Sequence, residues 1–229
     1  MNGDFPSRLV VFDVDGTLVD SQAHIMAAME YAYRAVGIAP PGRAEVLSIV
    51  GLSLPLAIER LAPDLSPGTR LALAEGYRES FASLRQTDGE NLSSLFPGMR
   101  PVLDGLLGRD DLLVGIATGK SRRGLRHVLA AHGLTGAFVT EQVADDHPSK
   151  PNPSMLFRAL EKTGAEARNA VMIGDTTFDI EMGRAAGFAT IGVAWGYHPT
   201  DALRAAGADC IVETAAALPA RIESLRGRP

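Results

Sequence analysis

The sequence contains only one cysteine, Cys210, among 229 residues. A single thiol cannot form a disulfide within the chain, and there is no CxxC pair or cluster of cysteine and histidine with zinc-ligand spacing. This cysteine usage is typical of a protein from a reducing compartment. We therefore expect a cytoplasmic protein without structural zinc.

The chain also lacks a surplus of basic residues, because 22 Lys and Arg are outnumbered by 27 Asp and Glu, for a formal net charge of −5. Nucleic-acid binding needs cations that neutralise phosphates and is therefore disfavoured. No apolar stretch approaches the roughly 20 residues of a membrane span. The first residues include Asp4 and Pro6, unlike a secretory leader with its basic start. We expect neither nucleic acid nor a membrane as partner.

Hydrophobic residues make up 46% of the chain and charged residues 21%, which is typical of an ordinary globular protein. Short runs of strand-forming residues occur at 9–12, 112–117, 170–173, 190–193 and 210–212. From residue 99 onward these runs alternate with helix-like segments, for example from the capping residue Ser121 to His132 and from Phe178 to Ala186. This alternation predicts an α/β fold with a doubly wound, mainly parallel, Rossmann-like sheet and helices on both faces.

Residues 20–95 interrupt this alternation. They contain helical patterns at 23–36 and 66–84 but no convincing run of strand formers. The turn signal Leu95-Phe96-Pro97-Gly98 follows, and a new helix is expected to start at Pro101. The sequence therefore predicts an α/β core formed by residues 1–19 and 96–229, with an all-helical cap domain inserted at 20–95.

The most prominent polar motif directly follows the first predicted strand. It reads Asp13-Val14-Asp15-Gly16-Thr17-Leu18, and carboxylates two residues apart project to the same side of an extended chain. Ligands of open α/β sheets bind outside the carboxyl ends of the strands, which is where both acids are expected. Gly16 permits a sharp turn there. Taken alone, the motif also fits an ordinary polar turn at the end of a strand.

Three further polar motifs follow in order. Thr118-Gly119-Lys120 comes after the strand at 112–117 and offers a hydroxyl and an exposed N–H at a helix start, which suits an anion. Lys150 is a lone cation between residues that restrict the backbone. Asp175 and Asp179 follow the strand at 170–173, and their hard oxygens suit Mg²⁺. Each motif alone has a structural explanation, such as capping or a solvated loop, but together they indicate a site.

In their order, these four segments resemble the motifs of the haloacid dehalogenase-like superfamily. The helical insertion directly after the first motif is similar to that of members with an α-helical cap, among which phosphoglycolate phosphatases are nearest in layout. Within it, Val50-Gly51-Leu52-Ser53 resembles the cap loop that reaches the substrate in that group. The resemblance implies a phosphoric monoester hydrolase that acts on a small phosphorylated metabolite, with phosphoglycolate as the favoured candidate.

The resemblance also implies a role for each acidic residue. Asp13 would be the nucleophile that forms an aspartyl-phosphate, and Asp15 would be the general acid and base. Mg²⁺ would bind the carboxylates of Asp13 and Asp175 and the backbone carbonyl of Asp15. Asp179 would be a further ligand or an outer partner of these groups.

The phosphoryl oxygens would be held by Thr118, Gly119 and Lys150, again as the resemblance implies. Asp13, Asp175 and Asp179 together carry a charge of −3, and Lys150 carries +1. A phosphate dianion must still enter this site. At ~5 Å and an effective dielectric constant of ~20, each pair of like charges costs roughly 3 kcal/mol. A divalent cation is therefore expected as cofactor.

Two other functions stay open. A phosphomutase of the β-phosphoglucomutase type uses the same core, although no unusually basic cap helix is visible that would hold a second phosphate. A non-catalytic binding protein on this fold would be expected to have lost a motif residue, and none is missing. Relatives that cleave carbon–halogen or carbon–phosphorus bonds generally lack a carboxylate at the position of Asp15, so those activities are disfavoured. The sequence does not indicate the oligomeric state.

A few remaining residues are expected to have structural roles. His24 is expected on a helix surface, and Arg122 and Arg123 are expected in solvent near the phosphate motif. The aromatic pair Trp195 and Tyr197 follows a strand and is expected to anchor a loop.

Overall fold

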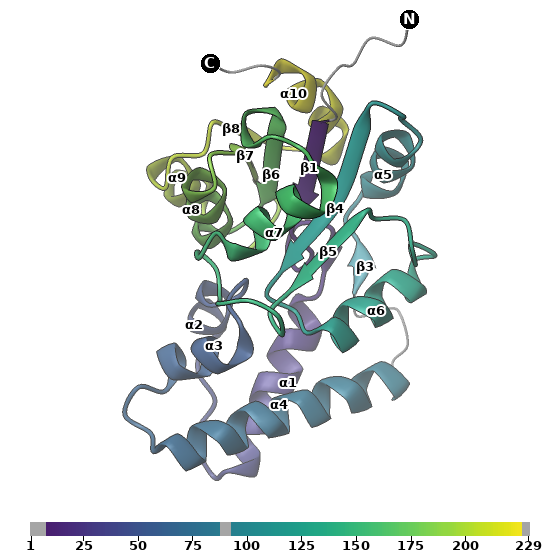
Figure 1. The fold of residues 1–229 in the computed structure, drawn as a ribbon. Helices are drawn as coiled ribbons and strands as arrows, with labels where there is room; N and C mark the ends of the chain where they lie inside the picture. Colours follow the sequence, from purple (N-terminus) through teal and green to yellow (C-terminus); the bar gives the residue numbers. More distant parts are fainter. Residues whose placement is uncertain (1–7, 88–92, 226–229) are drawn as a thin grey trace, which may run out of the picture.

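The computed structural model describes residues 8–87 and 93–225. Its main feature is a six-stranded sheet in which all neighbouring strands pair in parallel. Across the sheet the strands are β5 (Thr140–Val143), β4 (Leu112–Thr118), β1 (Arg8–Phe12), β6 (Ala170–Gly174), β7 (Ala189–Val193) and β8 (Cys210–Val212). Figure 1 shows helices beside this sheet and a separate group of helices beyond one end of it.

Helices cover both faces of the sheet because the buried strands are apolar on both sides. Val10 and Phe12 of β1 belong to one core cluster, and Leu9 and Val11 belong to the other. The first cluster includes side chains of α5 (Met99–Leu107), α6 (Arg122–Ala131) and α10 (Leu218–Ser224), and the second includes α7 (Ser154–Thr163) and α8 (Thr177–Ala185). Helix α9 (Thr200–Ala205) packs near β7 and β8. Two short 3₁₀ helices complete this part, η2 (Ala167–Asn169) and η3 (Ala215–Ala217). The predicted doubly wound parallel α/β fold is thus confirmed.

The register of the central strands brings the predicted motifs together. Phe12, the last residue of β1, pairs with Ile116 of β4 on one side and with Ile173 of β6 on the other. The residues that follow each strand therefore meet at the same edge, as expected at the carboxyl ends of parallel strands.

The described residues between β1 and α5 include the helices α1 (Gln22–Ala35), α2 (Arg43–Ser48), α3 (Leu54–Leu61) and α4 (Pro67–Thr87). Most of their buried apolar side chains form a cluster separate from the two clusters of the sheet, whereas Ala57 of α3 clusters with Phe178 of α8. In Figure 1 this group lies beyond the carboxyl end of β1, next to the site described below. The predicted strand-free character is wrong only at the edges, where β2 (Val19–Asp20) pairs antiparallel with β3 (Ser94–Leu95).

Two other details differ from the sequence prediction. Helix α5 begins at Met99, two residues before the expected start, because Gly98 adopts a left-handed conformation (φ 77°) that ends the preceding turn. Strand β5 was not predicted, since Thr140-Glu141-Gln142-Val143 is largely polar. The boundaries of the core and the cap at 19/20 and 95/96 stay a prediction, and residues 1–7, 88–92 and 226–229 of these domains lie outside the described residues.

Candidate active site

The loop after β1 begins the site. Asp13 continues the sheet by one hydrogen bond, its N–H donating to the carbonyl of Ile173 at 2.9 Å. Gly16 has φ +87°, which only glycine adopts without strain, and a Cβ atom there would overlap the carboxylate of Asp175. The turn therefore brings the first and the last predicted motif into direct contact.

Three buried carboxylates meet at this edge of the sheet. One oxygen from each of Asp13, Asp175 and Asp179 lies within 4.8 Å of the others, and all three side chains are almost fully buried. Lys150 is buried with them, and its Nζ donates to Asp13 and to Asp179 at 2.7 Å each. The structure therefore brings together four of the predicted site residues, with one cation among three acids.

The second carboxylate oxygen of Asp13, Oδ2, is buried and has no hydrogen-bond partner among the described residues. Burial raises the pKa of Asp13 to about 7, although the nearby Lys150 lowers it, and Asp179 adds a smaller rise. Burial and the charge of Asp13 likewise raise the pKa of Asp175. A bound cation would contact the oxygen that has no hydrogen-bond partner. It would also stabilise the ionised form of these buried carboxylates. Hard oxygen ligands of this kind fit Mg²⁺.

The other two acids are oriented by hydrogen bonds from their surroundings. Asp175 Oδ1 accepts from the hydroxyl of Thr17 at 2.9 Å, and Oδ2 accepts from the backbone N–H of Tyr197 at 2.8 Å. Asp179 Oδ2 accepts from the N–H and the hydroxyl of Thr176, which caps α8. Both acids are thus held facing Asp13 by residues outside the predicted set.

Asp15 faces away from the three buried acids. Its carboxylate lies 2.6 Å from Lys120 Nζ through both oxygens, and Oδ1 also accepts from the hydroxyl of Ser21 at 2.5 Å. Ser21 in turn contacts the hydroxyl of Tyr197, which lies 3.1 Å from Ser21 N and 3.2 Å from Ser21 Oγ. The carboxylate of Asp15 therefore stands at the end of a chain of polar groups, bound by Lys120 and Ser21 rather than by Lys150.

The predicted phosphate-binding residues after β4 lie beside the helical segment. Thr118 is 1% exposed, and its Oγ1 accepts from the N–H of Lys120 at 3.2 Å. A Cβ atom on Gly119 would overlap the carbonyl oxygen of Gly51, so this glycine allows the loop at Gly51-Leu52-Ser53 to touch the core. The N–H of Ser53 donates to Ser149 Oγ at 2.8 Å. The predicted cap loop is therefore in contact with two of the predicted motifs.

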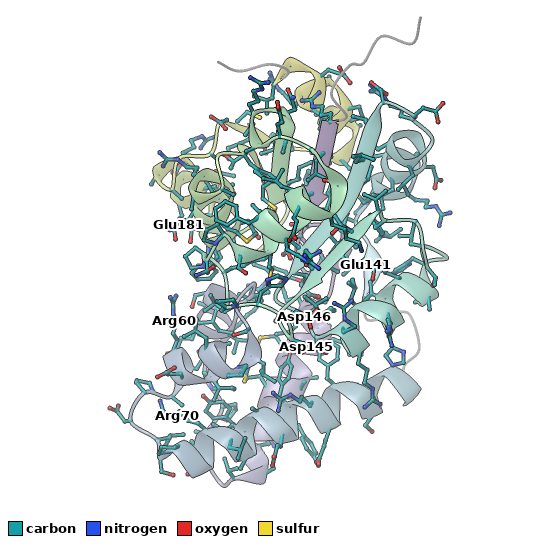
Figure 2. All side chains as sticks on the ribbon, viewed as in Figure 1. Arg60, Arg70, Glu141, Asp145, Asp146 and Glu181 are labelled. Atoms are coloured by element: carbon teal, nitrogen blue, oxygen red, sulfur yellow. The ribbon has the colours of Figure 1, made fainter. Side chains whose placement is uncertain are left out.

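A second contact joins the helices to the core at their outer boundary. The guanidinium carbon of Arg60, on α3, lies 5.2 Å from the centre of the Phe178 ring on α8. Figure 2 shows Arg60 at this boundary, with Glu181 nearby on the core side and Asp145 and Asp146 in the loop after β5.

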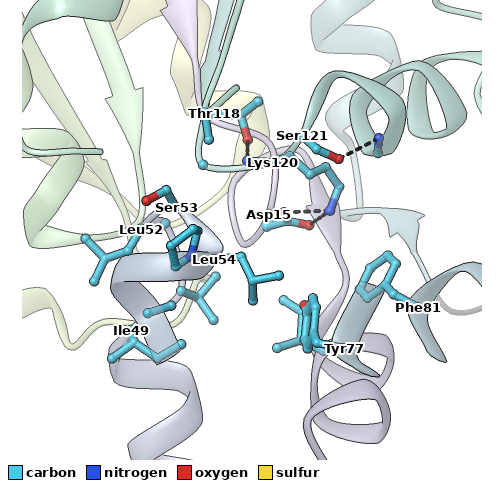
Figure 3. Close-up of a pocket in the computed structure, with 18 of the residues that line it drawn as sticks. Asp15, Ile49, Leu52, Ser53, Leu54, Tyr77, Phe81, Thr118, Lys120 and Ser121 are labelled. Atoms are coloured by element: carbon cyan, nitrogen blue, oxygen red, sulfur yellow. Dashed lines mark hydrogen bonds and ion pairs between the residues drawn. The ribbon is translucent and has the colours of Figure 1, made fainter. Parts of the chain in front are cut away.

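Between the helices and the strand ends lies a cavity of about 450 Å³. Asp13, Asp15, Thr118, Gly119 and Lys120 line its polar end, and the loop at Gly51-Leu52-Ser53 lines one side. Figure 3 shows the polar groups on one side of the cavity, with Ile49, Leu54 and Tyr77 across from them and Phe81 beside Lys120. Lys150, Asp175 and Asp179 do not line the cavity but lie behind Asp13, buried.

One sequence interpretation is wrong here. His24 is 1% exposed rather than on a helix surface, because its ring packs 4.9 Å from the Phe81 ring and its Nδ1 lies 3.0 Å from Ser93 Oγ. The residues that contact the predicted site residues but were not singled out for it include Thr17, Ser21, Lys120, Thr176 and Tyr197. Lys120 lies inside a recognised motif and could have been found there, whereas Ser21 and Tyr197 meet only after folding.

None of the helices in the described part of the chain is long and apolar enough to cross a membrane.

A family model described as haloacid dehalogenase-like hydrolase matches residues 10–193. Similar curated proteins include a probable phosphatase, IndB, of Dickeya dadantii (36% identical, covering 90% of this chain and 89% of that protein). A phosphoglycolate phosphatase of Vibrio vulnificus is 31% identical, with 92% and 94% covered.

Solved structures show the same fold. A predicted phosphoglycolate phosphatase from Haemophilus somnus superposes with a TM-score of 0.84 at 21% identity, covering 96% of this chain and 99% of the other. A hydrolase from Pseudomonas syringae reaches a TM-score of 0.83 at 24% identity, with the same coverage. Both alignments span the sheet and the helical segment together.

Proposed function

Because the chain belongs to the haloacid dehalogenase-like hydrolase family, we propose that it is a Mg²⁺-dependent phosphatase that hydrolyses a small phosphate monoester through an aspartyl-phosphate. The observation that carries this proposal is the buried oxygen of Asp13 without a hydrogen-bond partner, at the polar end of the cavity and beside Asp175 and Lys150. The names of the relatives make phosphoglycolate the reference substrate.

In the first step, a carboxylate oxygen of Asp13 attacks phosphorus as the bond to the ester oxygen breaks. The leaving alcohol takes a proton from Asp15. In the second step, a water molecule gives a proton to Asp15 and attacks the phosphorus, which releases inorganic phosphate and regenerates Asp13. Asp15 suits both transfers because it lines the cavity and is oriented by Lys120 and Ser21.

The metal would be held by the carboxylates of Asp13 and Asp175 and the backbone carbonyl of Asp15, with Asp179 in support. When bound, Mg²⁺ supplies charge that offsets the acids and the incoming phosphate. Lys150 offsets part of the same charge, and with Thr118 and Gly119 it would bind phosphoryl oxygens. A nearly buried arrangement of this kind keeps electrostatic interactions strong.

The helical segment at 20–95 would act as a cap that closes over the phosphate. This role as a cap is supported by two contacts at the mouth of the site. Ser53 contacts Ser149, and Gly51 contacts Gly119. Closure excludes water and assembles the cavity around the leaving group. A mutase would need cations in the cap to bind a second phosphate. Among the described cap residues that line the cavity, the exposed Arg78 is the only cation. Hydrolysis is therefore favoured over mutase chemistry.

The test is phosphate release from a panel of small monoesters, with and without Mg²⁺. We expect release to need Mg²⁺, to stop with EDTA and to be inhibited by Ca²⁺, whose looser coordination misplaces nucleophile and phosphate. Asp13→Asn should lose more than about 10³-fold in kcat. Asp201→Asn is the matched control, since that side chain is 93% exposed and does not line the cavity. Activity that persists in Asp13→Asn would contradict the mechanism.

A further inference from the structure

The wall of the cavity that faces the leaving group is apolar. Across from Asp15 and Thr118, the cavity is lined mainly by hydrophobic side chains of the helical segment, among them Met29, Ile49, Leu54, Tyr77 and Phe81. Such a surface stabilises the apolar part of a ligand and penalises a charged group that finds no partner there.

The basic residues around the cavity are placed unfavourably for a second anionic group. Arg78 and Arg123 are exposed to solvent. Lys120 is 9% exposed but is already paired with both carboxylate oxygens of Asp15. A carboxylate on the substrate, such as that of phosphoglycolate, would therefore meet the apolar wall without a buried cation among the described lining residues.

Two aromatic rings form part of this wall. Tyr77 and Phe81 lie one helical turn apart on α4, with ring centres 5.5 Å apart and planes inclined by 32°. Phe81 is held from the other sides by the His24 ring and by Lys120 Nζ, which lies 5.1 Å from the Phe81 ring centre. Phe81 is buried and backs the wall, whereas the half-buried Tyr77 offers an aromatic surface at the cavity for a flat ligand group. A cavity of about 450 Å³ has room for one, since pockets for small molecules span ~300–1,000 Å³.

We propose, resting on the phosphatase function above, that the substrate is a monoester whose alcohol carries a flat, uncharged ring close to the ester carbon. Its phosphate group lies at Asp13 and Thr118, and its ring lies against Tyr77. Esters of short carboxylated alcohols, phosphoglycolate included, are poor substrates by comparison, because the described lining residues offer their second charge no buried, unpaired cation.

Binding tests this inference independently of turnover. The probes are phenethylphosphonate and phosphonopropionate, which are non-hydrolysable analogues of benzyl phosphate and phosphoglycolate. They differ only in that the first carries a phenyl ring where the second carries a carboxylate. Calorimetry with the wild-type protein and Mg²⁺ should give a Kd at least about tenfold lower for phenethylphosphonate. A smaller difference, or tighter binding of phosphonopropionate, overturns the proposal.

A pair of variants locates the ring. Tyr77→Leu keeps an apolar side chain but removes the flat surface, and should weaken phenethylphosphonate binding about threefold or more while leaving phosphonopropionate unchanged. Tyr31→Leu, at a position 53% exposed on α1, is the control and should bind both probes like the wild type. Equal losses for both probes in Tyr77→Leu would mean a general disturbance of the cap and would overturn the assignment of this wall to the ring.

Turnover separates this inference from the proposed function. Benzyl phosphate and phosphoglycolate have alkyl leaving groups of similar quality, so the ratio of their kcat/KM values reports recognition, and it should exceed about ten. Hydrolysis of both esters at similar rates would support the proposed phosphatase function and contradict the proposed preference for a ring-bearing substrate. Absence of hydrolysis, even of para-nitrophenyl phosphate, would contradict the proposed phosphatase function. The ratio of the Kd values of the two phosphonates would still test the preference for a ring.

Discussion

Lys120 Nζ lies 2.6 Å from both carboxylate oxygens of Asp15 and 5.1 Å from the centre of the Phe81 ring. One side chain thus contacts the proposed acid and base of the core and the aromatic wall of the helical segment. Its position two residues after Thr118 places it at the start of α6, where Ser121 caps the helix. Lys120 therefore connects catalysis with closure in the proposed mechanism.

Replacing this lysine should mainly slow the cleavage of esters with poor leaving groups. Lys120→Met removes the two hydrogen bonds that orient Asp15, so we expect kcat/KM for benzyl phosphate to fall about 10- to 100-fold. Para-nitrophenyl phosphate needs little protonation of its leaving group and should lose less. Lys162→Met, at an exposed position near the end of α7, is the control. Equal losses for both esters would show that Lys120 does not act through Asp15.

Tyr197 is expected to be a positioning residue. Its hydroxyl holds Ser21, which donates to Asp15, and its backbone N–H holds Asp175. Burial and the charge of Asp15 raise the pKa of Tyr197, so its hydroxyl stays protonated and able to donate. Tyr197→Phe should lower kcat about tenfold for benzyl phosphate and less for para-nitrophenyl phosphate.

The control for this variant is Tyr31→Phe, at a residue 53% exposed on α1. It should keep both activities. If Tyr197→Phe changed only the melting temperature and neither kcat value, the tyrosine would be a structural anchor, as its sequence position alone suggests.

The strands were predictable because buried parallel strands are apolar throughout, as in Leu9-Val10-Val11-Phe12. Strand β5 was missed since it pairs only with β4 at the sheet edge and carries Glu141 and Gln142. In the candidate site, residues directly after a strand could be placed from the sequence. The partners of Asp15 could not, because Tyr197 reaches Ser21 across 176 positions and nothing local encodes that contact.

The stability of the metal-free protein should depend on pH through the buried acids. The pKa of Asp13 is raised to about 7, so between about pH 4 and pH 7 the folded state binds more protons than the unfolded state. The free energy of unfolding should therefore fall as pH rises through this range, and Asp175 acts in the same direction. Asp13→Asn should flatten this dependence.

Magnesium should reverse this loss, because a cation displaces the protons that the acids would otherwise hold. We expect the rise in melting temperature on adding Mg²⁺ to be larger at about pH 8 than at about pH 5, and to be smallest in Asp13→Asn. Thermal unfolding monitored by circular dichroism, with EDTA and with Mg²⁺, measures both effects. A metal-independent melting temperature at both pH values would contradict the assignment of these acids as ligands.

Removal of the proposed cap tests whether the helical segment determines substrate choice. Most buried apolar side chains of α1–α4 form their own cluster, whereas Ala57 packs with Phe178 of the core. Val19 and Asp20 pair with Leu95 and Ser94, so the two connections to the core lie side by side. A short Gly/Ser linker from Ser21 to Ser93 can therefore replace residues 22–92 while keeping the Ser21 contact with Asp15.

The shortened protein should keep weak hydrolysis of para-nitrophenyl phosphate, because Asp13 and Asp175 at the strand ends and Lys150 in the loop after β5 all remain. It should lose the shielding and the apolar wall that favour alkyl esters. We expect the kcat/KM ratio of benzyl phosphate to para-nitrophenyl phosphate to fall at least about tenfold. Asp13→Asn in the shortened chain should abolish the remaining activity, which shows that it arises from this site. If the shortened chain has a cooperative unfolding transition and an unchanged ratio, substrate choice resides in the core and the assignment of the cap is wrong.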